Sequence, residues 1–342
     1  MQPLAITQGD SAGIGPEIVA KAFRDAPDAL RGCFVAGDVA TLRRAGQAIV
    51  RPGVPTVPVA QIASPADVLG VPPRCIPVLQ LPGIAGPQPW GQISADAGRA
   101  AADSVVWAAR AALRGEVAGL VTAPLHKEAL AAACVAFPGH TELLQAEAAV
   151  HQGVALAQMP VRMMLASDEL RTVLVSIHMS LRDAIAAVTT ENILQTLQIT
   201  HAALVRSLGR PPRIAVAGLN PHAGEGGLFG SEEVEVIAPA LAAARAQGLD
   251  VHGPIAPDTV FMRARRAPGR AGEFDVVIAM YHDQGLIPVK YLGVDKGVNV
   301  TLGLPLVRTS PDHGTAFDIA GQGVADAASL VEAVRMARAL SA

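Results

Sequence analysis

Three histidines, each at the end of an apolar segment, are the residues of this chain best suited to chemistry. They are His178, which follows residues 172–177, His222, which follows residues 213–219, and His282, which follows residues 276–280. Unbroken apolar runs are typical of buried strands, and open α/β sheets bind ligands beyond the carboxyl ends of their strands. Three neutral imidazoles suit a divalent metal such as Zn, Co or Mn. Each histidine alone would more simply be structural, but the shared position favours a metal site.

A second set of polar residues, two cations and an amide, lies in an otherwise apolar region. The set consists of Lys290, Asn299 and Arg308. Arg308 directly follows the run Leu304 to Val307, and a buried arginine needs an anion. A phosphate group meets this need through charge-assisted hydrogen bonds. Lys290 could equally be a solvated surface charge, so the prediction of a phosphorylated substrate rests mainly on Arg308.

The segments that must position these residues predict an α/β fold. Apolar runs indicate strands near residues 4–6, 33–38, 117–121, 162–166, 172–177, 213–219 and 276–280, and helices are expected at 94–114 and 191–208. The turn at residues 9–15 invites a dinucleotide-binding interpretation. We reject it because the third glycine is absent at the required spacing. That turn is either purely structural or lines the functional site.

Several polar residues have simpler explanations as helix-start signals. Thr141 and Ser180 are placed to cap the helices that follow them, and a cap also explains Asp258. The acidic pair Glu232 and Glu233 suits the positive end of a helix dipole. These explanations compete with any functional role for Thr141 and Asp258.

Composition excludes several classes of protein. The 342 residues, 51% of them hydrophobic, suffice for one large or two medium domains. A net charge of -3 leaves no electrostatic footprint for nucleic acid, and no apolar run approaches the roughly 18 residues of a membrane span. The N-terminus lacks signal-peptide features, and three cysteines without CxxC spacing are typical of buried free thiols. We therefore expect a soluble, cytoplasmic protein with no nucleic-acid or membrane partner.

Five long motifs, found in the same order, resemble one enzyme family. They are ITQGDSAGIGPEI, FPGHTELL, LNPHAGEGGLFG, YHDQGLIPVKYLG and GVNVTLGLPLVRTSPDHGTAFDIAG. They are similar to motifs of the 4-hydroxythreonine-4-phosphate dehydrogenase family of vitamin B6 synthesis, including its phospho-threonate and phospho-erythronate branch. The likeness covers nearly the whole chain. Gln8 and Ser11 depart from the family, which commonly has proline at these positions.

The resemblance implies a fold and an assembly. The fold would be three-layer α/β/α, like isocitrate and isopropylmalate dehydrogenases, with two subdomains flanking a cleft. We expect residues 1–125 and 275–342 to form a discontinuous first domain. Residues 126–274 would form the second domain and the dimer interface. The resemblance further implies a homodimer whose active site, including one metal ion, is shared between the two chains.

The resemblance also implies a role for each candidate residue. Substrate binding falls to His140, Thr141, Lys290, Asn299 and Arg308. Binding of a divalent metal (Zn, Co, Mg or Mn) falls to His178, His222 and His282. The loop that would bind NAD or NADP contains His313, Gly314, Thr315, Ala316 and Asp318, where Gly314 would let the backbone approach the nucleotide. The general base stays open among Asp258, Asp283 and Lys127.

Together these features predict an oxidative decarboxylation. A metal ion would polarise the substrate hydroxyl while hydride leaves for NAD, and the resulting β-keto acid would lose carbon dioxide. The expected reaction converts 4-phosphooxy-L-threonine to 3-amino-2-oxopropyl phosphate in pyridoxal phosphate synthesis. One alternative is a 4-phospho-D-threonate or D-erythronate 3-dehydrogenase of sugar-acid catabolism. An alternative from another class is a metal-dependent phosphatase or lyase that uses no nucleotide.

Overall fold

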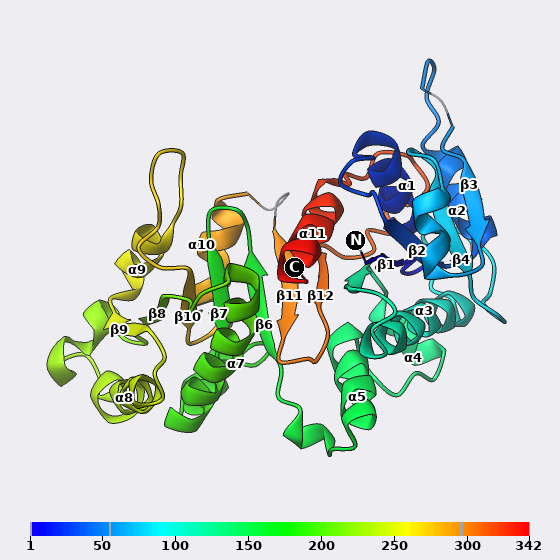
Figure 1. Ribbon diagram of the computed structural model, residues 1–342. Coiled ribbons are helices and arrows are strands. Elements are labelled where there is room, and N and C mark those ends of the chain that lie inside the picture. The colour runs from blue at the N-terminus through cyan, green and yellow to red at the C-terminus, as the bar shows by residue number, and fades with distance from the viewer. Residues whose placement is uncertain (1, 55, 294–296, 342) are drawn as a thin grey trace. The chain divides into compact units, whose positions relative to one another are not determined.

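The computed structural model describes residues 2–54, 56–293 and 297–341 (Figure 1). The chain divides into two compact units: unit 1 contains residues 1–160 and 304–341, and unit 2 contains residues 161–303. Each unit has a sheet covered by helices. The predicted α/β class is confirmed, whereas the more specific likeness to isocitrate dehydrogenase stays a prediction.

The unit boundaries differ from the expected ones at 125/126 and 274/275. Helix α5 (His140–Gln152) packs on α3 (Ala95–Leu113), so residues 126–160 stay with unit 1. Strand β10 (Val276–Ala279) lies between β7 (Arg171–Leu174) and β8 (Ile214–Ala217), which keeps residues 275–303 in unit 2. Packing between segments distant in sequence, which local patterns do not encode, decides both boundaries. The assignment of the dimer interface stays a prediction.

Unit 1 contains a parallel sheet in the order β3-β4-β2-β1-β5-β12. Its strands are β1 (Leu4–Thr7), β2 (Cys33–Gly37), β3 (Val59–Ile62), β4 (Ile76–Gln80), β5 (Gly119–Thr122) and β12 (Arg308–Pro311). Every residue of β1, β2 and β5 is buried, as expected for strands covered on both faces. The polar residues that follow these strands therefore lie at one edge of the sheet.

Helices cover the sheet of unit 1 in two groups. Besides α3 and α5, they are α1 (Gly15–Asp25), α2 (Val39–Ala48), α4 (Lys127–Ala132) and α11 (Ala328–Leu340), with short 3-10 helices at Pro65–Gly70 and Leu156–Gln158. Helix α3 packs on α4 and α5, and α1 packs on α2 and α11. Figure 1 shows α3, α4 and α5 below the strands and α1 and α11 above them. The expected helix at 94–114 is confirmed, since Ser94 caps α3 by accepting from the Ala97 N–H.

Unit 2 contains a mixed sheet in the order β11-β6-β7-β10-β8-β9. The remaining strands are β6 (Arg162–Ala166), β9 (Val251–Ile255) and β11 (Val298–Leu302). Strand β6 is antiparallel to both neighbours, whereas β7, β10, β8 and β9 run parallel. The carboxyl ends of β7, β10 and β8 therefore lie next to one another at one edge.

Helices also cover both faces of the unit 2 sheet. They are α6 (Leu181–Ala187), α7 (Thr190–Leu208), α8 (Ala238–Ala246), α9 (Pro257–Ala264) and α10 (His282–Tyr291), with irregular helical turns η3 (Pro221–Gly227) and η4 (Glu233–Ile237). Figure 1 shows α7 and α8 below the strands and α9 and α10 above. Among the described residues, no helix is long and apolar enough to cross a membrane.

The cysteines match the expectation only in part. Cys33 and Cys75 are buried and free, and burial raises the pKa of Cys33 to about 11. Cys134 is also free but exposed, so the prediction that all three thiols are buried is wrong. Cys134 adopts a positive φ of 54° just after α4, a turn that places its side chain in solvent.

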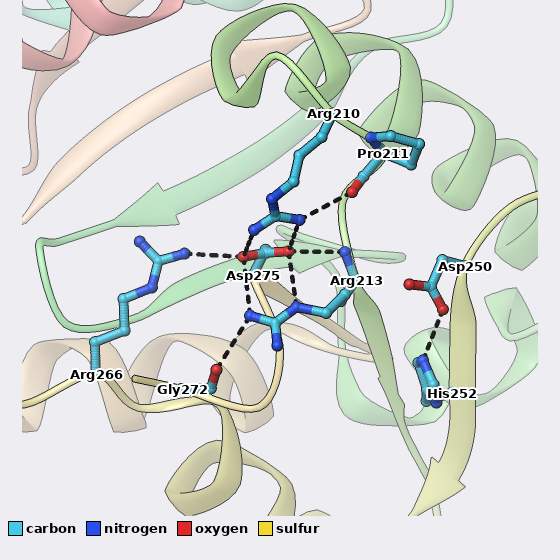
Figure 2. Close-up of polar contacts among 8 residues, drawn as sticks. All are labelled: Arg210, Pro211, Arg213, Asp250, His252, Arg266, Gly272 and Asp275. Atoms are coloured by element: carbon cyan, nitrogen blue, oxygen red, sulfur yellow. Dashed lines mark hydrogen bonds and ion pairs between the residues drawn. The ribbon is translucent and has the colours of Figure 1, made fainter. Parts of the chain in front are cut away.

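One buried carboxylate, Asp275, connects the residues that directly precede strands β8 and β10 in unit 2. Figure 2 shows three arginines around it. Both terminal nitrogens of Arg210 donate to it at 2.8 Å, the Arg213 N–H donates at 2.8 Å, and Arg266 donates at 3.2 Å. Burial alone would raise the pKa of Asp275, but the hydrogen bonds from Arg210 and Arg213 outweigh it and hold the pKa well below the usual value. The cluster lies at the edge opposite the polar strand ends, so we assign it to stability.

Asp275→Asn should destabilise the protein because it removes the negative charge that three arginines share. We expect a loss of about 3 kcal/mol, the lower end of the range for a broken buried ion pair, since the arginines are partly exposed. Because the folded-state pKa is depressed, the stabilisation is present above the unfolded pKa and is lost as pH falls below about 4. Urea unfolding at pH 7 and at about pH 2.5 measures both effects.

Asp250→Asn is the matched control, because Asp250 pairs with His252 while both side chains stay about half exposed (Figure 2). An exposed pair contributes about 0 to 1 kcal/mol, so this variant should unfold almost as the wild type does. Equal stability of the two variants would contradict the role assigned to Asp275.

Candidate functional site

Two of the three candidate histidines lie together at the carboxyl edge of the unit 2 sheet. Ser176, beyond the end of β7, donates its hydroxyl to the Met280 carbonyl beyond the end of β10 at 2.9 Å. This contact holds the segments that carry His178 and His282 side by side. The two imidazole rings are 5.8 Å apart between centroids. Both line a cavity of about 550 Å³, together with Met179, Ser180, Leu181, Tyr281 and neighbouring residues.

Asp283 orients the ring of His282. The Asp283 Oδ1 lies 2.7 Å from the His282 Nδ1, on the first turn of α10. A carboxylate accepts a hydrogen bond from Nδ1–H, and this leaves Nε2 with the free lone pair. Metal-binding histidines commonly have this carboxylate partner. Asp283, one of the three predicted general bases, therefore already has a hydrogen-bonding role toward His282.

His222 lies beyond the end of β8, on the irregular turn η3, and is not grouped with the other two histidines. Its side chain is 61% exposed, and its Nδ1 lies 3.0 Å from Glu225 Oε1. Its ring makes an edge contact with Phe229. Within residues 2–54, 56–293 and 297–341, no three His, Cys, Asp or Glu residues form a group that could hold a metal. One chain thus assembles two of the three predicted ligands.

Gln284 connects the strand ends that carry His222 and His282. Its side-chain carbonyl accepts from the Met280 N–H at 2.7 Å, and its amide donates to the Gly218 carbonyl at 2.8 Å. Gly218 directly follows β8, and Met280 directly follows β10. Sequence reasoning did not select Gln284, although its place after His282 and Asp283 in a strand-end motif was a usable signal.

The other unit 2 candidates occupy separate elements. Lys290 lies half-buried in the last turn of α10, and Asn299 lies half-buried on β11, opposite Leu165 of β6. Asp258 is exposed in the first turn of α9, whose N-cap is Ala256. The explanation of Asp258 as a helix cap is therefore wrong, because the helix begins one residue before it, at Pro257.

Arg308 is the central charged residue of the unit 1 candidates. Its side chain on β12 is buried, with 4% exposure, and its Nε and Nη2 donate to the Thr122 hydroxyl at 3.1 and 2.7 Å. Thr122 ends β5, the neighbouring parallel strand. Burial lowers the pKa of Arg308 to about 10, while Glu142 acts in the opposite direction. Arg308 is therefore still a cation at neutral pH.

His140 is the neutral partner of Arg308. Burial, and then the positive charge of Arg308, hold the pKa of His140 well below its usual value. Its Nε2 is shielded from solvent and has no hydrogen-bond partner among the described residues. His140 is the first residue of α5, and the N-cap is Gly139, so the prediction that Thr141 caps this helix is wrong. By contrast, Ser180 does cap α6, through the Asp183 N–H.

The loop at residues 313–318 packs against the turn at residues 9–15 within unit 1. The Ile14 N–H donates to the Thr315 carbonyl at 2.9 Å, and a Cβ on Gly13 would lie 2.9 Å from Thr315 atoms. Gly13 is therefore needed for close packing of the turn on the loop. In contrast, a Cβ on Gly314 would meet no atom within 4 Å, which leaves open space beside the loop.

His126 and Lys127 follow β5 on the other side of the same loop. The His126 ring stacks on Phe317 with centroids 4.7 Å apart. Lys127, a predicted general base, is exposed at the first position of α4. The stacking connects the end of β5 with the predicted nucleotide loop.

Asp10 and Ser11 are polar residues of unit 1 that sequence reasoning did not select. Both are fully buried, and each has one side-chain oxygen without a hydrogen-bond partner among the described residues. Burial raises the pKa of Asp10, and the Ala12 N–H and His126 act in the opposite direction. Their position just after β1 was the available sequence signal.

Comparison with known proteins defines the class to which this fold and these polar strand ends belong. Residues 29–337 match the family model described as pyridoxal phosphate biosynthetic protein PdxA. The chain is 53% identical, over 96% of its length and 92% of the relative, to a 4-hydroxythreonine-4-phosphate dehydrogenase of Beijerinckia indica. It is 43% identical, over 99% of its length and 98% of the relative, to a D-threonate 4-phosphate dehydrogenase of Salmonella typhimurium. These relatives place the chain among dehydrogenases that act on a CHOH group, as predicted.

The chain belongs to the PdxA family. Its structure superposes on that of a 4-hydroxythreonine-4-phosphate dehydrogenase from Klebsiella pneumoniae with a TM-score of 0.87, at 40% identity and with 100% of each chain covered. The predicted family is therefore confirmed.

Proposed function

We propose that this enzyme oxidises a four-carbon 3-hydroxy acid with a terminal phosphate, using NAD or NADP, in the cytoplasm. The preferred substrate is 4-phosphooxy-L-threonine, as in the name of the relative with 53% identity. The observation that carries the proposal is the buried, cationic Arg308 beside a neutral His140. A phosphate is the anion best suited to a planar guanidinium and a neutral imidazole.

Arg308 and His140 divide the recognition of the phosphate between them. The Thr122 hydroxyl holds two guanidinium nitrogens and so fixes the direction of Arg308. The His140 Nε2, shielded and without a partner, can donate or accept according to its tautomer. Because His140 stays uncharged, it adds a directed hydrogen bond without a second positive charge next to Arg308. We assign Thr141, Lys290 and Asn299 to the same substrate.

A divalent metal fits the histidine pair of unit 2. His178 and His282 line one cavity, and Asp283 leaves the His282 Nε2 free to bind a cation. His222 has the same arrangement, since Glu225 occupies its Nδ1. We therefore assign these three histidines as the metal ligands. When bound, the cation supplies Lewis-acid polarisation of the substrate hydroxyl.

The loop at residues 313–318 is our candidate for binding the nucleotide. Open space at Gly314 leaves room for a ligand beside the backbone, and His126 stacks on Phe317 at the side of the loop. We assign His313, Gly314, Thr315, Ala316 and Asp318 to the nucleotide. Because Asp283 already accepts a hydrogen bond from His282, we keep Lys127 and Asp258 as the candidates for the general base.

The exposed apolar residues beside His178 support a homodimer. Met179, Leu181 and Ile185 are each about half exposed, on the segment that begins directly after His178. Clustered apolar side chains of this kind commonly mark an interface. A second copy of the chain covering this face can supply His222 to the His178 and His282 pair, and so complete a set of three. We therefore propose that each metal is bound by both chains.

The function is tested by following NADH formation with a panel of four-carbon acids. We expect 4-phosphooxy-L-threonine to be oxidised, and its unphosphorylated analogue to react with a kcat/KM lower by about two to three orders of magnitude. Treatment with a chelator, with metal content checked, should stop the reaction until a divalent cation is added.

Other outcomes of the same panel select among the alternatives. A clear preference for 4-phospho-D-threonate or 4-phospho-D-erythronate would assign the enzyme to the branch of the Salmonella typhimurium relative. Release of phosphate without NADH formation would indicate a phosphatase. Equal rates with the phosphorylated and unphosphorylated acids would contradict the role of Arg308.

A further inference from the structure

The turn that carries His222 has an unfavourable backbone conformation. His222, Ala223 and Glu225 have φ angles of 53°, 56° and 41°, and Gly224 and Gly226 of the same turn are also left-handed. A left-handed conformation costs about 1 to 2 kcal/mol for each residue other than glycine. Such a turn persists only where the surrounding structure holds it in place, and strain of this kind clusters at functional sites.

Glu233 is the residue that holds this turn. Its side chain is buried, with 2% exposure. Its Oε1 accepts hydrogen bonds from the backbone N–H groups of Leu219 and Asn220, both at 2.7 Å, and its Oε2 accepts from the Asn220 Nδ2 at 2.9 Å. One carboxylate therefore binds the segment that leads from β8 into the turn.

Glu233 also contacts the middle of the turn. A Cβ on Gly224 would lie 2.7 Å from the Glu233 Oε2, so the turn packs directly on the carboxylate. Only glycine fits there, because φ at Gly224 is +78° and the space is filled. The turn is thus fixed at its entry by hydrogen bonds and at its centre by close packing on the same side chain.

The sequence had suggested a different reason for an acidic residue at this position. Glu232 and Glu233 were expected to match the dipole of the following helix. Instead, Glu233 begins the π-helical turn η4 and points away from solvent, whereas Glu235 of the same turn is exposed. The turn η4 runs directly into α8, and single π-helical turns joined to α-helices are frequent at functional sites. The burial of Glu233 therefore serves the His222 turn and is not explained by the dipole.

We propose that Glu233 is a positioning residue for the metal site: it never contacts the metal, but it holds His222 in the orientation that binds it. This inference rests on the proposed role of His222 as a metal ligand. Without the carboxylate, the left-handed turn loses three hydrogen bonds and relaxes toward ordinary backbone angles, which moves His222. Residues that support a metal ligand in this way typically change metal affinity by about 10-fold to 100-fold when replaced.

The test is titration calorimetry of Co²⁺ into chelator-treated full-length protein, at a temperature where every variant is folded. Glu233→Gln turns one acceptor into a donor that faces the Asn220 Nδ2, and should weaken Co²⁺ binding about 10-fold to 100-fold. Glu235→Gln is the matched control, because it makes the same charge change on the same turn at an exposed position. It should bind Co²⁺ as the wild type does.

Two further variants separate the possible outcomes. Asn220→Ala removes the side-chain hydrogen bonds to Glu233 and Glu232 but keeps both backbone hydrogen bonds to Glu233. It should weaken binding several-fold, so it decides the question if Glu233→Gln does not fold. His222→Ala tests the ligand itself. Weak binding by His222→Ala together with wild-type binding by Glu233→Gln and Asn220→Ala would overturn the inference about Glu233. The assignment of His222 as a metal ligand would stand. Wild-type binding by His222→Ala, or no Co²⁺ binding by the wild type, would overturn the metal assignment and the inference with it.

A purely structural role for Glu233 predicts a different pattern. In that case Glu233→Gln lowers the melting temperature of the metal-free protein but leaves the Co²⁺ dissociation constant of the folded protein unchanged. We expect both to change, and the dissociation constant is the measurement that decides.

Discussion

An equal mixture of two inactive variants, His178→Ala and His222→Ala, should regain about a quarter of wild-type activity after subunit exchange. Each variant alone should lose about a thousandfold in turnover, because a Lewis-acid metal contributes several kcal/mol to the reaction. The recovery follows if each site takes His178 and His282 from one chain and His222 from the other. Half of the dimers are then mixed, and one of the two sites in each mixed dimer keeps all three histidines. The measurement is NADH formation by the exchanged mixture.

The structure supplies the control for this experiment. His178 and His282 lie in one chain with their rings 5.8 Å apart, so in the proposed arrangement both ligands of a site come from the same chain. A mixture of His178→Ala and His282→Ala therefore leaves every site with a missing ligand and should stay inactive. Recovery in this control, or no recovery in the first mixture after exchange is verified, would contradict a site shared in this way.

Arg308→Ala should lower kcat/KM for the phosphorylated substrate by about two to three orders of magnitude. The reason is that no cation would then compensate the negative charge of the buried phosphate. The effect on the unphosphorylated analogue should be small. Binding energy from the remote phosphate can be used to position the reacting carbon, so the loss should fall on kcat as well as KM. Steady-state kinetics with both compounds measures the difference.

The pH dependence of the wild type provides a second check on Arg308. Burial lowers the pKa of Arg308 to about 10, so the cation is present at neutral pH and is lost as pH rises through that value. The preference for the phosphorylated compound should fall over the same range. Arg308→Lys should restore only part of the activity, since an ammonium cannot reproduce the planar geometry of two donors. An equal loss on both compounds in Arg308→Ala would point to a structural defect.

Local sequence patterns were sufficient for the strongly patterned elements and for the family. A run such as Val276 to Ala279, in which every residue is apolar, lacks the alternation of apolar and polar residues that a strand with one exposed face shows. It therefore identifies a buried strand from the local sequence alone. Ser94 and Ser180 identify helix starts because the capping hydrogen bond reaches only three residues along the chain. The long motifs identify the PdxA family for the same reason, since each is read within one continuous segment.

Helix-start signals failed where the chain offers alternatives that are close in sequence. Thr141 and Gly139 are two residues apart, and the helix begins after Gly139. Glu233 has the sequence signature of an acid at the start of a helix, yet its partners are Leu219 and Asn220. No local rule separates a carboxylate at a helix start from one that is buried against a distant strand end.

What the sequence by itself determined is therefore the type of the strongly patterned elements, the family, and a set of candidate residues for binding a metal or a phosphate. The tertiary structure alone decided which of them meet. His178 and His282 come together because β10 inserts beside β7, an order of strands set by packing between segments about a hundred residues apart. The burial of Arg308, the neutrality of His140 and the left-handed turn at His222 likewise depend on neighbours distant in sequence. Sheet order and burial are properties of the whole folded chain, because they arise from the apolar surface that its elements exclude from water together.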